Sequence, residues 1–195
     1  MIIKNVQNYD GSDLHQRFAY RYLRKNVGPL GDVVIFRGNM NVKENLVDQE
    51  DLLNNDYINS YDAINIIWEI PNLCPLGAVA FQRLFNVQIA NILSTQYLNK
   101  PIEVDGDDLM VHETFTGSDN KEYNVGKCSV SITYSKNNVA LGHTGINIVA
   151  GRSAPGFAFS TNLSDEDVES FMVDIQEIFY TNLQDMYVAT TKVIV

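Results

Sequence analysis

The sequence predicts an α+β domain with a mixed, mainly antiparallel β-sheet flanked by helices. Short apolar runs rich in β-branched residues follow one another without a helix between each pair, which excludes a doubly wound parallel sheet. Two longer segments instead show the 3.6-residue period of amphipathic helices. The chain has 195 residues, of which 45% are apolar, so we expect one domain over residues 1–195 with a single core.

The first half of the chain predicts two helices and two strands. A helix over residues 12–26 is indicated by apolar side chains four residues apart and by a basic last turn. The β-branched runs at 32–37 and 63–70 predict buried strands. Residues 39–60 between them are rich in Asn and Asp and predict a loop with one helical turn. Residues 76–98 form the longest helical pattern, with an apolar arc wide enough to pack on more than one side.

The second half predicts further strands and a final helix. Residues 107–113 are expected to join the central sheet, together with a hairpin formed by 126–135 and 138–149. An asparagine pair joins the two hairpin strands, and asparagine tolerates the positive φ that such a turn needs. Ser164 is expected to cap a helix that has an acidic first turn and an apolar stripe. The terminal TTKVIV predicts a last strand.

Composition and charge exclude several classes of function. The formal net charge is −10 and the sequence pI is about 4.6, so the surface should repel nucleic acid. The sequence contains two cysteines, a scarcity that fits a reducing cytoplasm, and we expect a cytoplasmic protein. The N-terminus has no signal-peptide pattern, and no run of about eighteen apolar residues predicts a membrane span.

Metal-binding patterns are incomplete in this sequence. The two cysteines stand alone, and His112 lacks the second histidine of a helical zinc motif. The acidic residues around Gly106 lack the terminal glutamate of a calcium loop, so a solvated turn is the favoured interpretation. We therefore predict no metal site.

Polar side chains at the ends of predicted strands form the candidate site. Arg37 closes the strand at 32–37, Lys127 opens one hairpin strand, and His143 and Asn147 end the other. Arginine and lysine can bind a carboxylate or a phosphate, so we expect Arg37 and Lys127 to share one anion pocket. The alternative is that Lys127 is a solvated charge.

The segment VGKCSVSITYSKNNVALGHTGINIVA resembles the core of biotin and lipoate protein ligases. In those enzymes a Gly-Lys strand is followed by a strand that ends in a Gly-Ile-Asn-Val-like motif. The preceding strand, helix and Asp-Leu strand stand in the same order, and the resemblance covers about residues 30–150. Residues 143–147 also resemble the His-Gly-x-x-Leu-Asn element of octanoyl transferases. A biotin/lipoate protein ligase-like fold is the implication.

The chain as a whole resembles an uncharacterised family known chiefly from archaea, the domain of unknown function 366. The stretches VVIFRGNMNVKENLVDQEDL and YVATTKVIV carry that likeness. This second resemblance implies no activity.

The ligase resemblance implies binding of a small carboxylic acid or its adenylate and transfer of the acyl group. Lys127 would contact the acyl carboxylate and the adenylate phosphate, while Gly145 and Asn147 would wall the acyl pocket. ATP is the candidate cofactor. His143 is placed beside Lys127 as a candidate catalytic residue, because histidine can move protons near neutral pH. A satisfied structural histidine is its alternative. The segment FRGNMNVKEN stands where ligases have a Gly- and Arg-rich loop, and it adds three candidate ligand-binding residues, Arg37, Gly38 and Lys43.

Departures from the ligase pattern keep other functions open. The arginine-rich loop is missing, and no cysteine nucleophile follows the histidine-containing strand as octanoyl transferases require. The alternative is a non-catalytic small-ligand-binding or protein-interaction domain with the same fold. Gly145 also has two interpretations: a ligand lies over it between His143 and Asn147, or it marks a bulge. An exposed sheet edge could pair two chains as a homodimer.

Overall fold

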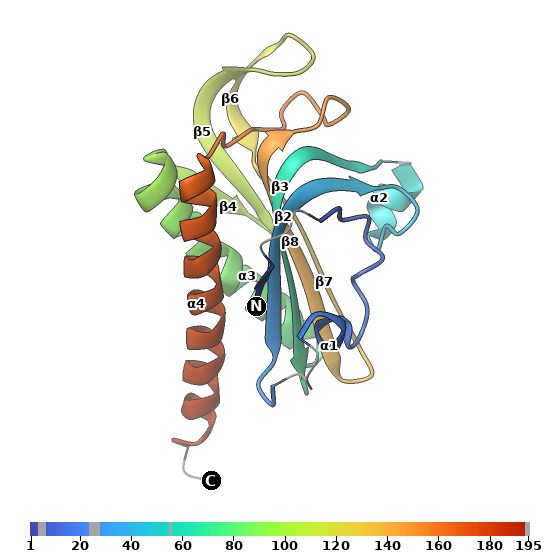
Figure 1. Cartoon of the computed structure of the whole chain (residues 1–195), viewed down its shortest axis with the longest axis vertical. Helices are drawn as coiled ribbons and strands as arrows, with labels where there is room; N and C mark the ends of the chain where they lie inside the picture. Colours follow the sequence, from blue (N-terminus) through green and yellow to red (C-terminus); the bar gives the residue numbers. More distant parts are fainter. Residues whose placement is uncertain (4–6, 24–27, 55, 194–195) are drawn as a thin grey trace.

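A five-stranded sheet forms the centre of the computed structural model, which describes residues 1–3, 7–23, 28–54 and 56–193 (Figure 1). Its strand order is β1-β2-β3-β8-β7, and only the β1–β2 pair is parallel. The strands are β1 (Ile2–Ile3), β2 (Asp32–Val42), β3 (Ile58–Pro71), β7 (Ser129–Lys136) and β8 (Val139–Ala150). The β7–β8 turn uses Asn137 and Asn138 at φ 51° and 61°, which confirms the positive φ expected of the asparagine pair.

A second, smaller sheet corrects one prediction. It contains β4 (Ile102–Asp105), β5 (Asp108–Thr116) and β6 (Glu122–Lys127) in that order. The strand predicted at 107–113 therefore exists but does not belong to the central sheet, because an apolar run identifies a strand without identifying its partner. The sheets meet at Cys128, which donates its N–H to the Leu109 carbonyl and accepts from Asn147.

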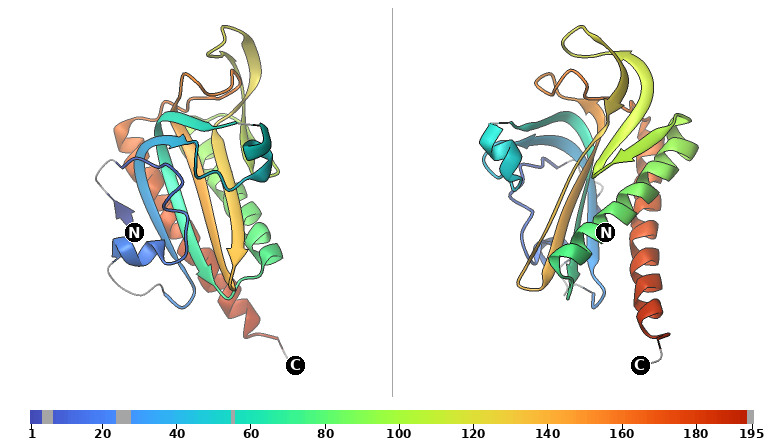
Figure 2. Two further views of the ribbon diagram at one scale, coloured as in Figure 1. Left: turned by 90° about the vertical axis from the view of Figure 1, so that its right-hand side faces the viewer. Right: turned by 180° about the vertical axis from the view of Figure 1, so that it is seen from behind.

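Two long helices cover one face of the central sheet (Figure 2). They are α3 (Pro75–Ile92), which continues as the π-helical turn η1 (Leu93–Leu98), and α4 (Asp165–Thr190). Aromatic side chains dominate this core, since Trp68 of β3 contacts Phe81 of α3, and Phe81 contacts Phe179 of α4. Among the described residues, no helix is both long and apolar enough to cross a bilayer.

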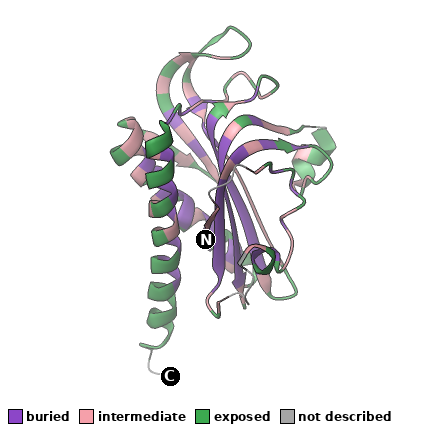
Figure 3. Ribbon diagram, in the orientation of Figure 1, coloured by how far each residue is buried: buried purple, intermediate pink, exposed green. Residues whose placement is uncertain are grey.

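The opposite face is covered at one end only. There α1 (Phe18–Leu23) and the segment before it place Tyr9, Leu14 and Phe18 against Phe36 of β2 and other strand residues. The short helix α2 (Gln49–Asn54) stands away from the sheet and has no buried residue, in contrast to the central strands (Figure 3). The part of this face between α2 and the second sheet carries the cavities described below.

Helix boundaries and faces differ from prediction at three places. The helix predicted at 12–26 is a helix only over α1, after Arg17 at φ 63°, and 24–27 lie outside the described residues. The α3 face that includes Leu76, 79% exposed, is open to solvent, so the helix buries mainly its phenylalanine face. The terminal strand is wrong, since α4 continues through Thr190, and 194–195 lie outside the described residues. The Ser164 cap is confirmed: its Oγ accepts from the Asp167 N–H at 3.1 Å.

Candidate functional site

Lys127 lies where the two sheets meet. It ends β6 rather than opening the hairpin, and its Nζ is 2.8 Å from Asp108 Oδ1 at the start of β5. About a third of each side chain is exposed, 29% for Lys127 and 31% for Asp108. The lysine is therefore neither a fully solvated charge nor a buried one.

Two adjoining cavities open beside Lys127, and we call them together the Lys127 cleft. The larger has a volume of about 520 Å³ and reaches Asn147; the smaller, of about 250 Å³, reaches His143. Both are lined by Asp51, Ile58, Lys127 and Val130. The larger has a mainly apolar wall, completed by Tyr57, Pro155, Phe157 and Ala158.

Asn147 lines the larger cavity with a side-chain amide that has no hydrogen-bond partner among the described residues. The residue is 6% exposed, and its backbone is satisfied, since its N–H donates to Cys128 and its carbonyl accepts from Thr161. Its side chain forms no hydrogen bond with any residue that the structure describes. The amide atoms are not among the fully enclosed, unpaired side-chain atoms of the described residues, so they are open to the cavity and available to a ligand.

His143 is held as a structural residue. Its ring is 2% exposed, stacks on Tyr9 with centroids 3.9 Å apart, and places Nε2 3.1 Å from Asn65 Oδ1. Burial lowers the pKa of His143 to about 3, so the imidazole is neutral near pH 7. A ring in this state does not exchange protons near neutral pH, which corrects the expected catalytic role and favours the structural alternative.

Gly145 makes room for another part of the protein. A Cβ atom built on this glycine would lie 2.3 Å from the sulfur of Met40 in β2. The expected ligand over Gly145, between His143 and Asn147, is therefore wrong, because the Met40 side chain occupies that space.

Arg37 belongs to the opposite face of the central sheet. Its guanidinium forms ion pairs of 2.6 Å with Asp62 and with Asp165 at the start of α4. Strand alternation places its side chain with those of Val33 and Ile35, which pack in the core beneath the long helices. The anion pocket expected to be shared with Lys127 is wrong, since Arg37 lines neither cavity of the Lys127 cleft.

The two other candidates from the same segment also lie outside the cleft. A Cβ on Gly38 would lie 1.5 Å from the Gln7 carbonyl oxygen, so this glycine allows the N-terminal segment to approach β2. Lys43 is exposed, with its Nζ 5.3 Å from the centroid of the Tyr57 ring. Neither residue lines the two cavities beside Lys127.

Acidic residues are the feature of the cleft that sequence reasoning missed. Lys127 is the one basic residue among the described residues that line the cleft. The carboxylates that line it are Asp48, Glu50, Asp51, Asp56, Asp107 and Asp108. Burial raises the pKa values of Asp51 and Asp108 above the ordinary range. The paired aspartates at 107–108 and the acidic run near 50 were the available signal, but their convergence requires the fold.

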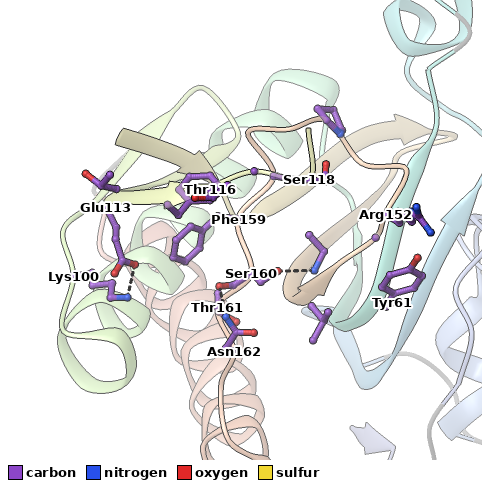
Figure 4. A pocket seen from close by; sticks show the side chains of 18 residues that line it. Tyr61, Lys100, Glu113, Thr116, Ser118, Arg152, Phe159, Ser160, Thr161 and Asn162 are labelled. Carbon is purple, nitrogen blue, oxygen red and sulfur yellow. Dashed lines mark hydrogen bonds and ion pairs between the residues drawn. The ribbon is translucent and has the colours of Figure 1, made fainter. Parts of the chain in front are cut away.

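A separate cavity of about 590 Å³ lies between the β5–β6 hairpin and the segment 151–162 (Figure 4). Lys100 and Glu113 form an ion pair at one end, and Arg152 and Tyr61 lie at the other. It contains none of the seven residues expected to bind or react. Within the described part of the chain, no cluster of three His, Cys, Asp or Glu side chains could hold a metal ion.

Comparison with known proteins identifies the family. The model of DUF366, a domain of unknown function, matches residues 1–194. The chain belongs to the DUF366 family. No curated protein matches the sequence. A solved structure, a protein of unknown function from Pyrococcus horikoshi, is 23% identical, with a TM-score of 0.82 over 100% of this chain and 98% of that one.

Two further solved structures show the wider fold of this DUF366 protein. The Aquifex aeolicus biotin protein ligase, solved with biotin and ATP, is 14% identical, with a TM-score of 0.54 over 94% of this chain and 70% of that one. P. falciparum LipL1, solved with lipoate, is also 14% identical, with a TM-score of 0.53 over 93% of this chain. This chain spans only 60% of that protein. The likeness confirms the α+β, biotin/lipoate ligase-like fold.

Proposed function

We propose that this DUF366 protein binds a small carboxylic acid in the larger cavity of the Lys127 cleft. The ligand carboxylate faces Lys127 Nζ and the Asn147 amide, and its carbon chain lies along the apolar wall near Phe157. The observation that supports the proposal is that a partly buried cation and the unpaired amide of a buried residue line one cavity. Proteins of the same fold that were solved with lipoate or biotin add support.

The chemistry of the cavity suits this class of ligand. A lysine ammonium and an amide N–H both donate to a carboxylate, and hydrogen bonds between charged groups are stronger than neutral ones. The apolar wall contributes about 25 cal/mol for each Å² that the ligand covers. A single cation does not provide the forked geometry that arginine offers, so the orientation of the ligand depends on Asn147 as well as on Lys127.

The residues of the cleft do not fit the triphosphate of ATP. Carboxylates such as Asp51 and Asp108 would face the phosphates, and Lys127 is the one basic side chain that lines the described cleft. The neutral His143 also offers no proton transfer near pH 7. The proposal is therefore ligand binding without adenylation or acyl transfer, and we expect no ATP–pyrophosphate exchange in the presence of hexanoate or octanoate.

Calorimetric titration with hexanoate and octanoate tests the proposal, with hexanamide as the neutral comparison. We expect both acids to bind, hexanamide to bind at least tenfold more weakly than hexanoate, and Lys127→Gln to weaken the acids by a similar factor. Lys121→Gln is the control, because Lys121 pairs with Asp119 on an exposed turn and lines neither cavity of the cleft. Equal affinity of hexanoate for Lys127→Gln and the wild type would remove the basis of the proposal.

A further inference from the structure

The Lys127 cleft contains carboxylates whose negative charge a simple carboxylic acid, itself an anion, cannot neutralise. Three of its carboxylates have partners: Asp48 accepts the Glu50 N–H at 2.7 Å, Asp107 pairs with Arg83 at 3.4 Å, and Asp108 pairs with Lys127 at 2.8 Å. The side-chain carboxylates of the remaining three, Glu50, Asp51 and Asp56, form no hydrogen bond or ion pair with any described residue, although the charge of Lys127 acts on Asp51 at longer range.

Asp51 differs from the other unpaired carboxylates in its position. Glu50 and Asp56 are exposed and therefore solvated, whereas Asp51 is half-buried. Asp51 also lines both cavities, on the α2 side of the cleft, while Lys127 and Asn147 come from β6 and β8. Burial raises the pKa of Asp51 by more than the nearby charge of Lys127 lowers it, so the carboxylate is only partly compensated and a second cationic group in the cavity would stabilise it.

The unpaired side chain of Asn147 is a second, independent observation that points to a ligand in this space. The residue is more than nine-tenths buried, lines the cavity that Asp51 also lines, and its side-chain amide pairs with none of the described residues. The cavity therefore combines a donor pair for an anion, Lys127 and Asn147, with an acceptor for a cation, Asp51. A monocarboxylate would pair only with Lys127 and Asn147 and would add a negative charge next to Asp51.

We infer that the ligand is an amine-bearing carboxylic acid, a zwitterion of the amino-acid class, whose ammonium pairs with Asp51 while its carboxylate faces Lys127 and Asn147. This inference rests on the proposed function and adds the second charged group of the ligand. Such a ligand carries no net charge into the acidic cleft. Specificity against simple fatty acids follows, because those acids leave Asp51 unpaired.

Titration with matched six-carbon ligands tests the inference: 6-aminohexanoate, hexanoate and hexylamine, repeated with their four-carbon counterparts. We expect the amino acid of at least one length to bind at least tenfold more tightly than the unsubstituted acid of that length. Asp51→Asn should abolish this advantage without weakening hexanoate. Asp185→Asn, the same substitution on the exposed end of α4, is the control and should change nothing. Circular dichroism checks that each variant is folded.

The outcomes separate the inference from the proposed function. If hexanoate and 6-aminohexanoate bind equally, and the four-carbon pair does the same, the zwitterion is wrong and the carboxylic-acid site stands. An amine advantage that survives in Asp51→Asn also overturns the inference, because the ammonium then has another partner. If hexylamine binds while hexanoate and 6-aminohexanoate do not, the proposed function itself is wrong. If none of the ligands binds, both the inference and the proposed function are wrong.

Discussion

Single polar residues of β8 have roles that depend on partners far away in the sequence. Strand alternation places His143, Gly145 and Asn147 on one face, as the sequence predicts. What covers that face cannot be read from the strand, since Tyr9 stacks on His143 and Met40 fills the space over Gly145. Of the three, His143 lines the smaller cavity and Asn147 the larger, so the alternation predicted the face but not what lies against each side chain.

The pH dependence of stability tests the assignment of His143. Its pKa is about 3 when folded and near 6.5 when unfolded, so the unfolded state binds more protons between these values. His143 therefore lowers the free energy of unfolding as pH falls from 6.5, by about 1.4 kcal/mol per pH unit. Between pH 6.5 and 5.0, we expect the free energy of unfolding to fall by about 2 kcal/mol less in His143→Gln than in the wild type, measured by urea unfolding at each pH. Identical pH profiles would show that the ring is not desolvated.

Substitution of Gly145 tests the packing of Met40. A valine at this position would overlap the Met40 sulfur, so we expect Gly145→Val to lower the free energy of unfolding by about 1–3 kcal/mol. Adding Met40→Ala should recover part of that loss, which chemical denaturation can measure. If Gly145→Val removed hexanoate binding without any loss of stability, a ligand rather than Met40 would occupy this space.

Whole elements illustrate which features a periodic pattern can predict. The helical period identifies α3 and α4, and the β-branched runs identify β2, β3 and the β7–β8 hairpin. The pattern does not tell which neighbour an element will meet. The strand at 107–113 therefore appeared to belong to the central sheet, and the exposed leucine face of α3 appeared buried. Lys127 was assigned to the wrong strand for the same reason, although its place beside the hairpin was expected.

The cap of α4 provides a test at the level of the element. Ser164 Oγ accepts the N–H of Asp167 in the first turn, which is the arrangement expected from the sequence. We expect Ser164→Ala to lower the free energy of unfolding by about 1 kcal/mol, measured by urea denaturation. Ser118→Ala on an exposed turn serves as the control. An unchanged unfolding midpoint in Ser164→Ala would mean that solvent replaces the cap at no cost.

The ion pair between β5 and β6 sets the charge that a ligand meets. Asp108 lies 2.8 Å from Lys127 and competes with any carboxylate that approaches it. We expect Asp108→Asn to bind hexanoate about three- to tenfold more tightly, because one negative charge is removed at unchanged shape. Burial raises the pKa of Asp108 above its ordinary range, so wild-type affinity should increase as the pH falls and this carboxylate begins to take up protons. Calorimetry should find a flatter pH profile in Asp108→Asn; weaker binding by this variant would contradict the competition.

For the whole molecule, the order of the helices and strands along the chain predicted more than the amino-acid composition did. The ligase-like sequence of strand, helix, strand and hairpin indicated the fold, and the DUF366 resemblance extended to both ends of the chain. The net charge of −10 predicted only what the surface should repel. The acidic lining of the Lys127 cleft could not be predicted, because α2 contributes to it from more than fifty residues before β5 and β6.

A crystal structure of the protein soaked with 6-bromohexanoate tests the central claim most directly, because the bromine marks the ligand by its anomalous signal. The account predicts a carboxylate oxygen about 2.9 Å from Lys127 Nζ, a second within hydrogen-bonding distance of the Asn147 amide, and bromine along the wall near Phe157. Bromine density confined to the cavity between Lys100 and Arg152, with the Lys127 cleft empty, would contradict it.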